Sequence, residues 1–341
     1  MFNARLSSAS PPFRSIPGTQ NHPSVQSPTQ RTTSLSQGPS GPGNVNPNRS
    51  SGARLARSIT DDNAFGRQLD EWVAAGGPDE RRKDAAARIR TCKKSNCRML
   101  NITSSNLRSL PTCVVSLSKL QDFTLSFNCL EALPDGFDKL TTLENLNLEG
   151  NKLVSLPDRF DQLTALKILN LKGNNLETLP DGFDQLTALK SLNLKGNNLK
   201  TLPDGFDKFK ALWSLALSNN KLKTLPDGLG KLTQLGVLEL DNNNLKMLPN
   251  WFDKLMKLCS LTLHGNPLKT LPHGFGKLTS LTTLSVTPEI FSGKEDSGLV
   301  KEVLDPDECR IQATGRFLEL CNADDAERAA ALARTAPANS I

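Results

Sequence analysis

Leucines and polar residues alternate along the chain in a unit that recurs every 23 residues. One unit, residues 166–188, has the sequence LKILNLKGNNLETLPDGFDQLTA. The same step separates two series of residues: asparagines at 128, 151, 174, 197, 220, 243 and 266, and prolines at 111, 134, 157, 180, 203, 226, 249 and 272. A fixed period of this length indicates stacked structural repeats, because one unit alone cannot bury its apolar residues.

The order of residue types within the unit predicts its local structure. Leu169 and Leu171 alternate with polar residues, which is typical of a strand with its leucines turned inward. Asn174 follows the strand, where a side-chain amide can satisfy buried backbone groups of the turn. Pro180 ends the extended stretch because it has no N–H to continue a ladder. Phe183 is then expected to be buried on the opposite, convex side.

This frame, L-x-x-L-x-L-x-x-N-x-L-x-x-L-P-x-x-F-x-x-L, is the leucine-rich-repeat pattern. It predicts an α/β repeat fold over residues 97–290: a leucine-rich-repeat solenoid with a curved parallel β-sheet. The repeat pattern ends where the next asparagine would fall, because Glu289 stands at that position after Pro288.

Residues 59–96 have a helical periodicity instead. Phe65, Leu69 and Trp72 stand at i, i+4 and i+7, which places them on one face of a helix that two glycines end at 76–77. Pro78 then predicts the start of a second helix, with the acidic residues 79–80 in its first turn. We expect this N-terminal helical cap to cover the open end of the sheet.

Two terminal segments complete the domain organisation. Residues 1–58 are rich in Ser and Pro and have few apolar residues, so we expect a disordered segment, serving either export or no function. Residues 291–341 are expected to form a short capping tail, helical from about residue 305, with Ile311 and Phe317 among its apolar residues.

The charge distribution argues against nucleic-acid binding. The net charge of +6 comes from 41 basic and 35 acidic residues, and residues 1–60 hold six arginines and no acidic residue. Without these six, 35 basic residues remain against 35 acidic ones, so the positive charge belongs to the N-terminal segment and not to a binding face.

Few residues are available for metal, cofactor or catalytic chemistry. Seven cysteines stand at 92, 97, 113, 129, 259, 309 and 321 without a C-x-x-C spacing, and there are three histidines. We expect no metal site, no cofactor and no catalytic residue. His264 and His273 are expected to be solvated surface residues. For the cysteines we expect reduced thiols, with a Cys92–Cys97 disulfide as the alternative. No stretch has the ~18 apolar residues of a membrane span, and the N-terminus lacks the apolar core of a signal peptide.

The helix pair and the repeats together resemble the leucine-rich-repeat effectors that bacteria deliver by type III secretion, in the "novel E3 ubiquitin ligase" family. The matching run is DEWVAAGGPDERRKDAAARIRTC, with Trp72, Pro78, Arg82, Ala85, Ile89 and Cys92, followed by a first strand and NLRSLP. The resemblance covers about residues 66–290. It gives residues 1–58 the role of an export segment, for which a secretion chaperone is an expected partner.

Two departures from that family bear on activity. These repeats are longer than is usual in the family, and only 51 residues follow residue 290, whereas a compact domain needs ~100 residues. The family's ligase cysteine lies in a Cys-x-Asp motif, and neither Cys309 nor Cys321 is followed by that pattern. We therefore expect no enzyme activity.

These features predict a protein-binding effector, secreted by a bacterium into the host cytoplasm, that engages a host protein through its concave sheet. One alternative is the substrate-recognition part of an E3 ubiquitin ligase whose catalytic domain is missing or supplied in trans. A second is a structural scaffold unrelated to secretion, since the repeat is generic.

The predicted binding face is the set of outward positions on the strands. Trp213 is the exception among mostly polar residues, because an exposed tryptophan beside small and apolar neighbours is typical of an interface anchor. Lysines lie to one side of it and carboxylates to the other, a polarity that can orient a partner. The candidate residues are Ile168, Lys172, Lys195, Trp213, Ala216, Val237, Glu239 and Asp241.

Overall fold

The structure is a computed structural model that describes residues 48–287, 290, 304–305 and 310–311, with side chains for residues 61–287 and 290. The chain falls into two compact units, residues 1–52 and 53–341, and the architecture below is that of the second. Sequence predictions that concern residues 1–47 and most of 291–341 lie outside the described residues.

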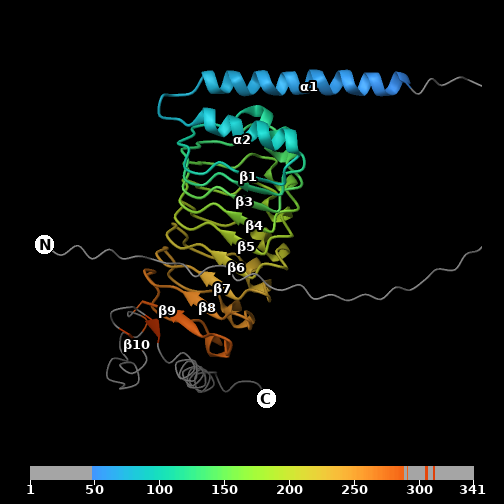
Figure 1. The fold of residues 1–341 in the computed structure, drawn as a ribbon. Coiled ribbons are helices and arrows are strands. Elements are labelled where there is room, and N and C mark those ends of the chain that lie inside the picture. Colours follow the sequence, from blue (N-terminus) through green and yellow to red (C-terminus); the bar gives the residue numbers. More distant parts are fainter. Residues whose placement is uncertain (1–47, 288–289, 291–303, 306–309, 312–341) are drawn as a thin grey trace, which may run out of the picture. The chain divides into compact units, whose positions relative to one another are not determined.

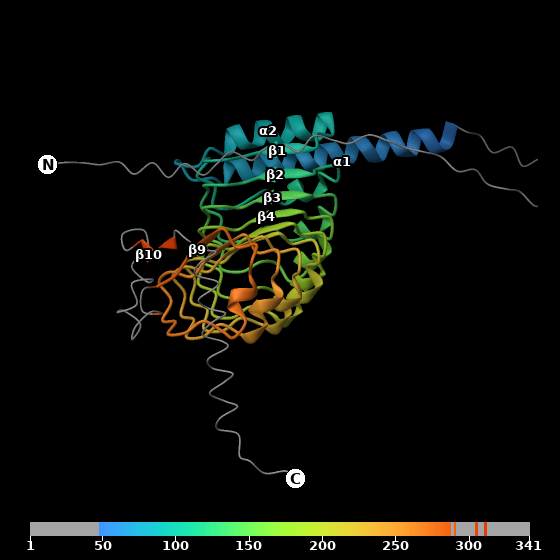
Figure 2. The same ribbon diagram turned by 90° about the horizontal axis from the view of Figure 1, so that it is seen from below.

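A parallel sheet runs through all the repeats, as the 23-residue period predicts. Each strand is three residues long and pairs in register with the strand of the next repeat, so that Leu169 lies beside Leu192 and Leu146. Figures 1 and 2 show these strands stacked along the coil. They are β1 (Met99–Asn101), β2 (Asp122–Thr124), β3 (Asn145–Asn147), β4 (Ile168–Asn170), β5 (Ser191–Asn193), β6 (Ser214–Ala216), β7 (Val237–Glu239), β8 (Ser260–Thr262) and β9 (Thr283–Ser285).

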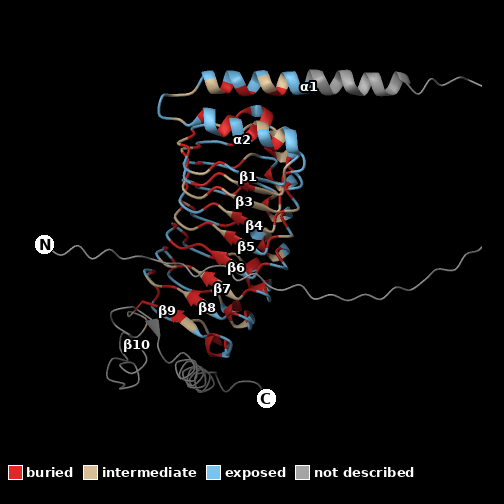
Figure 3. Ribbon diagram, viewed as in Figure 1, coloured by how far each residue is buried: buried red, intermediate tan, exposed pale blue. Residues whose placement is uncertain are grey.

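Short 3-10 helices form the side of each repeat opposite the strands. They are η1 (Thr112–Ser116), η2 (Phe137–Lys139), η3 (Phe160–Gln162), η4 (Phe183–Gln185), η5 (Asp204–Lys208), η6 (Asp227–Lys231), η7 (Asn250–Lys254) and η8 (Phe275–Lys277). Each phenylalanine in them is buried, and the Phe160 and Phe183 rings lie 6.5 Å apart. Figure 3 shows how the buried residues line every turn of the coil. The predicted burial of Phe183 is confirmed.

The repeated asparagines satisfy the backbone inside the turns. Asn174 Nδ2 donates to the carbonyl of Leu171 in its own turn (2.9 Å) and to that of Leu148 in the preceding repeat (3.0 Å). Its Oδ1 accepts from the N–H of Leu153 (3.1 Å). The same set of bonds recurs in the neighbouring repeats, and Asn174 is buried. The predicted role of these asparagines is therefore confirmed.

The two helices α1 (Asn48–Ala74) and α2 (Arg82–Ser95) lie at the β1 end of the sheet (Figure 1). Arg82 joins them to the first repeat. Its guanidinium donates to the carbonyl of Trp72 (2.6 Å), lies 4.9 Å from the centre of the Trp72 ring, and donates to Ser109 Oγ (3.2 Å). Leu69, Trp72 and Ile89 are buried, as the helical pattern predicts.

The start predicted for the second helix is wrong. It begins at Arg82 and not at Pro78, because Glu80 uses its carboxylate to close a turn. Glu80 accepts from the N–H of Gly77 (3.1 Å) and of Arg108 (3.0 Å), and from Arg82 Nε (2.9 Å). Burial raises the pKa of Glu80, but the hydrogen bonds from Arg82 and from the two backbone N–H groups outweigh this effect and lower the pKa to about 2.

Helix α1 begins at Asn48, ahead of residue 59, where the sequence placed the end of the disordered segment. The sequence offers a reason, since Leu55 and Ile59 are themselves spaced i, i+4, and the intervening Ala and Arg residues favour a helix.

Cysteines 92 and 97 form a disulfide, so the predicted reduced state is wrong for this pair and the alternative is confirmed. Asn96, in the left-handed conformation, turns the chain at the end of α2 and brings the two Cα atoms to 4.8 Å. Cys113, Cys129 and Cys259 are free.

Beyond the last strand of the repeats, two short antiparallel strands are added to the sheet. The strands β10 (Leu304–Asp305) and β11 (Arg310–Ile311) pair antiparallel, and Arg310 pairs with Ser285 of β9. The helix predicted from about residue 305 is therefore wrong for these residues, where the chain adds pairs to the open edge of the sheet instead.

Candidate functional site

The outward side chains of the strands and of the residues that flank them form one surface, which we call the concave face. Along β3 to β8 the middle residue of each strand is buried, whereas the residues on either side are half-buried or exposed, apart from Ala216. The eight residues selected from the sequence all belong to this face.

Trp213 lies outside the core, in agreement with the sequence analysis. It stands directly before β6 and is 47% exposed. Its indole leans toward the next repeat, where Gly236 leaves room: a Cβ at that glycine would lie 3.7 Å from Cε3 of the indole. Ile168 is 41% exposed and Val237 is half-buried. The centre of the face therefore presents three accessible apolar side chains.

An ion pair crosses β6 and covers its small residues. Lys195, just after β5, places Nζ 4.0 Å from a carboxylate oxygen of Glu239 on β7. Ala216 lies between these strands, in register with Glu239, and is buried, as is Ser218. Ala216, which the sequence analysis selected for the binding face, is therefore not open to a partner, because the long Lys195 side chain reaches across it to Glu239.

Asp241 is occupied by hydrogen bonds within the face. Its carboxylate accepts from Ser218 Oγ (3.2 Å), from the N–H of His264 (3.1 Å) and from Thr262 Oγ1. His264 is half-buried, not fully solvated as predicted, and its Nδ1 is buried without a hydrogen-bond partner among the described residues. Asp241 thus holds the face together and is not free to meet a partner.

Most of the lysines on the face are also paired, in a way that the sequence analysis did not anticipate. Lys172 Nζ lies 2.8 Å from Glu149, and Lys167 Nζ lies 2.6 Å from Glu144. Lys195 pairs with Glu239, so these two opposite charges already meet within the face. Each of these lysines is neutralised by a carboxylate one or two strands away.

Phe127 is an exposed aromatic residue that the sequence analysis missed. It is 56% exposed and has a φ of 55°, at the repeat position that elsewhere carries Ser, Gly or Asn with positive φ. Its ring lies over the next repeat, because a Cβ at Gly150 would come 2.8 Å from Cδ1 of Phe127. An aromatic residue in a column of glycines was the available signal.

The described residues offer little chemistry beyond binding. They contain no group of three or more His, Cys, Asp or Glu side chains that could hold a metal ion. Burial raises the pKa of Cys113 to about 11, so this thiol is protonated at neutral pH and is a poor nucleophile. Among the described helices, none combines the length and apolarity that a membrane crossing requires.

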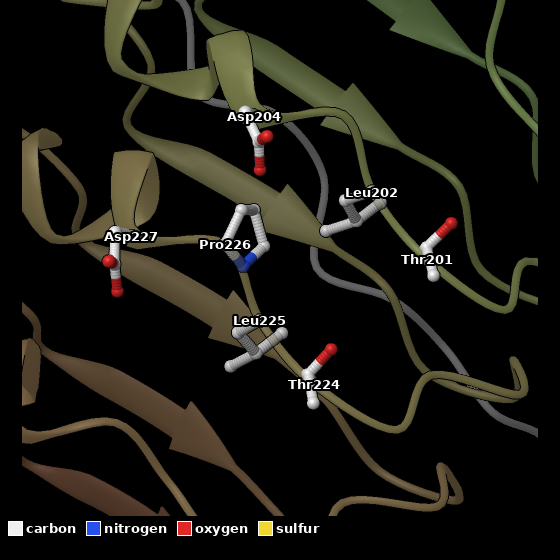
Figure 4. Close-up of a pocket in the computed structure, with 7 residues that line it drawn as sticks. All are labelled: Thr201, Leu202, Asp204, Thr224, Leu225, Pro226 and Asp227. Atoms are coloured by element: carbon white, nitrogen blue, oxygen red, sulfur yellow. The ribbon is translucent and has the colours of Figure 1, made fainter.

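A polar hollow of about 370 Å³ lies between the arms that lead into η5 and η6 (Figure 4). It is lined by Thr201, Leu202, Asp204, Thr224, Leu225, Pro226 and Asp227. These side chains come from the T-L-P-D sequence at 201–204 and 224–227, which also stands at 178–181. The hollow is therefore a product of the repeat, without a residue that distinguishes it from its neighbours.

Comparison with protein families matches the repeats. The family described as "Leucine rich repeat" matches residues 95–153, 154–199 and 164–222, and "Leucine-rich repeat region" matches 212–305. Together these matches span more than half of the chain. A comparison with curated protein sequences gives no match.

Several solved structures are similar to the chain. YopM, a leucine-rich effector protein from Yersinia pestis, is 30% identical with a TM-score of 0.57, over 66% of this chain and 59% of YopM. The leucine-rich-repeat domain of a Shigella effector is 29% identical with a TM-score of 0.50, over 60% of this chain and 86% of that domain. A leucine-rich-repeat protein of Leptospira interrogans is 29% identical with a TM-score of 0.52, over 58% of this chain and 57% of that protein.

The chain thus spans less than two thirds of the YopM and Leptospira proteins. What it shares with them is the stacked sheet, and the family matches cover the same repeats. The chain belongs to the leucine-rich-repeat proteins and resembles the repeat domains of bacterial effectors.

Proposed function

We propose that this protein is a bacterial effector, delivered into the host cytoplasm, that binds a host protein through its concave face. Trp213 is the observation that carries the proposal. An indole that is 47% exposed beside Val237 and Gly236 leaves apolar area in contact with water, and burial of that area against a partner is favourable. The similarity to the Yersinia and Shigella effectors supports the cellular setting.

The test compares two exposed apolar residues of equal accessibility. The full chain is immobilised, a protein retained from host lysate is identified, and its affinity is measured for Trp213→Ala and for Met256→Ala. Met256 is 49% exposed but lies between η7 and β8, away from the concave face. We expect Trp213→Ala to weaken binding roughly 30-fold, equivalent to about 2 kcal/mol, and Met256→Ala to leave it unchanged. Equal affinities for the two variants would contradict the proposal.

Delivery is tested separately. Residues 1–58, for which a secretion chaperone is the proposed partner, are deleted from the second residue onward, and secreted protein is measured from a bacterium with a type III system. We expect secretion to be lost. Secretion at the normal level would contradict the export role, although binding through the concave face would be unaffected.

We propose further that the chain acts by occupying its target and not by catalysis. Incubation with ubiquitin and its activating and conjugating enzymes is expected to give no conjugate. A thiol-sensitive conjugate that disappears with Cys309→Ser or Cys321→Ser would establish the ligase alternative instead.

A further inference from the structure

We propose that the concave face recognises an extended segment of the partner in which a large apolar side chain stands next to a carboxylate. The apolar side chain contacts Trp213 and Val237, and the carboxylate pairs with Lys190. This inference rests on the proposed function, since it assigns the partner chemistry of the same surface.

The charge pattern of the face selects a carboxylate. Lys167, Lys172 and Lys195 each have a glutamate partner within 4.0 Å. Lys190 is exposed and, in the part of the chain that the structure describes, its ammonium has neither an ion-pair nor a hydrogen-bond partner. Between β3 and β8 it is the one lysine of the described face whose charge is left for a partner.

Lys190 and Trp213 occupy equivalent positions in adjacent repeats. The N–H of Trp213 donates to the carbonyl of Lys190 (3.0 Å), so the two residues stand side by side directly before the neighbouring strands β5 and β6, which are ~4.8 Å apart. Consecutive residues of an extended peptide are separated by about 3.3 Å. A carboxylate one or two residues from the apolar side chain can therefore reach Lys190.

The residues beside this pair leave the apolar contact open. Ser191 and Ser214 stand in register between Ile168 on β4 and Val237 on β7. Two short serines between two accessible aliphatic residues keep the side of Trp213 uncovered, whereas Lys195 and Glu239 close the neighbouring part of the face over Ala216. The pattern favours one large side chain at Trp213.

A polyanion does not fit these observations. Nucleic acids are bound by several cations that contact successive phosphates, but the lysines around Lys190 are already neutralised within the face. One free cation beside an indole is instead suited to a single carboxylate next to an apolar group, where the two contacts fix the register of the segment.

The experiment selects short random peptides displayed on phage against the immobilised full chain and three variants. Trp213→Ala removes the apolar contact, and Lys190→Glu inverts the free charge. Lys221→Glu is the matched control, because Lys221 is also exposed and without a side-chain partner among the described residues but follows the buried Asn220 outside the face.

We expect the wild type and Lys221→Glu to enrich peptides with Leu, Ile, Phe or Met next to Asp or Glu by roughly ten-fold or more. Trp213→Ala should lose this enrichment, and Lys190→Glu should exchange the acidic neighbour for Lys or Arg.

The outcomes separate the two proposals. If Trp213→Ala enriches the same peptides as the wild type, the proposed surface itself is wrong. If Trp213→Ala loses enrichment but Lys190→Glu keeps the acidic preference, only the carboxylate assignment is overturned. No enrichment by the wild type also overturns it. A dimer in sedimentation that Trp213→Ala dissociates would make a second copy of the chain the occupant and would overturn the inference as well.

Discussion

The buried turn and the concave face follow the same 23-residue period but use it in opposite ways. At the turn, asparagine recurs without change from Asn128 to Asn266, and every member is buried. At the position before each strand, four successive repeats carry Lys190, Trp213, Gly236 and Cys259. A position that must satisfy the same backbone groups in each repeat is constrained to one residue, whereas a position that faces solvent is free to vary and to acquire a binding role.

The comparison predicts that stability resides in the invariant positions. The largest loss is expected for Leu171→Ala, because Leu171 is fully buried and the truncation leaves a cavity. The free energy of unfolding should fall by about 2–5 kcal/mol in urea denaturation. A loss as small as that of an exposed residue would contradict the assigned register.

Glu80, a buried carboxylate in the N-terminal cap, is also expected to contribute to stability. Glu80→Gln should cost about 3 kcal/mol at neutral pH, because the native pKa of Glu80 is about 2 whereas its unfolded value is 4.5. The folded pKa is lowered, so this stability is fully present above pH 4.5 and is lost as the pH falls toward 2.

Denaturation of both proteins at neutral pH and near pH 2 measures the effect, and the difference between them should disappear in acid. Glu177→Gln is the control, since Glu177 forms an exposed pair with Lys200 and should have almost no effect at either pH. A difference between wild type and Glu80→Gln that persists unchanged in acid would show that the carboxylate charge is not responsible.

Asn174→Ala sharpens the comparison within one repeat. It removes the donor to two buried carbonyls and the acceptor for one buried N–H, so unfolding should become easier by about 1–3 kcal/mol. Ser191→Ala, on the concave face one repeat later, should change stability by less than about 0.5 kcal/mol. Similar losses of stability for the two variants would contradict the division of roles between the buried turn and the concave face.

Gly150→Ala and Gly173→Ala compare alanine at two positions with the same backbone conformation. Gly150 and Gly173 have φ values of 67° and 65°, so alanine is strained at both by about 1–2 kcal/mol. Only at Gly150 would the new methyl group meet the Phe127 ring, at 2.8 Å, whereas at Gly173 the nearest atom is 3.7 Å away. Thermal unfolding should show a larger loss for Gly150→Ala, and Phe127→Ala should remove the excess. Equal losses in the two single variants would mean that the ring moves aside freely.

The repeats could be predicted from the sequence because each buried position is dictated by contacts with an identical neighbour. Contacts that occur only once in the molecule could not be predicted from the sequence. The Lys195–Glu239 pair depends on a side chain that crosses a whole strand, and it is possible only because Ala216 lies beneath it. That Lys190 carries an unpaired charge among the described residues could be recognised only from the structure, which shows the partners of the other lysines on the face.

The same limit applies at both ends of the solenoid. The turn built on Glu80 replaces the first turn of a helix through bonds to Arg108, which is distant in sequence. The strand pair around Arg310 depends on the open edge of β9, whereas a local apolar pattern predicted a helix there. The exposure of Trp213, by contrast, follows from its variable position between two leucines of the L-x-x-L-x-L frame and was predicted correctly.

The smallest effect on stability is expected for the residue with the largest effect on binding. Trp213→Ala should leave the unfolding temperature nearly unchanged, because the indole is about half exposed and does not belong to the buried core. A marked loss of stability would show that Trp213 belongs to the stabilising core of the repeats and not to a binding surface.

Fluorine NMR on protein labelled with fluorinated tryptophan tests the central claim most directly. The chain has three tryptophans, of which Trp72 and Trp251 are buried. Each resonance is assigned from a Trp→Phe variant, and the captured partner is then added. The account predicts that only the Trp213 resonance responds to solvent in the free protein and that it shifts or broadens as the partner binds. A Trp213 resonance that is unchanged at saturation would contradict the claim that the partner occupies the concave face.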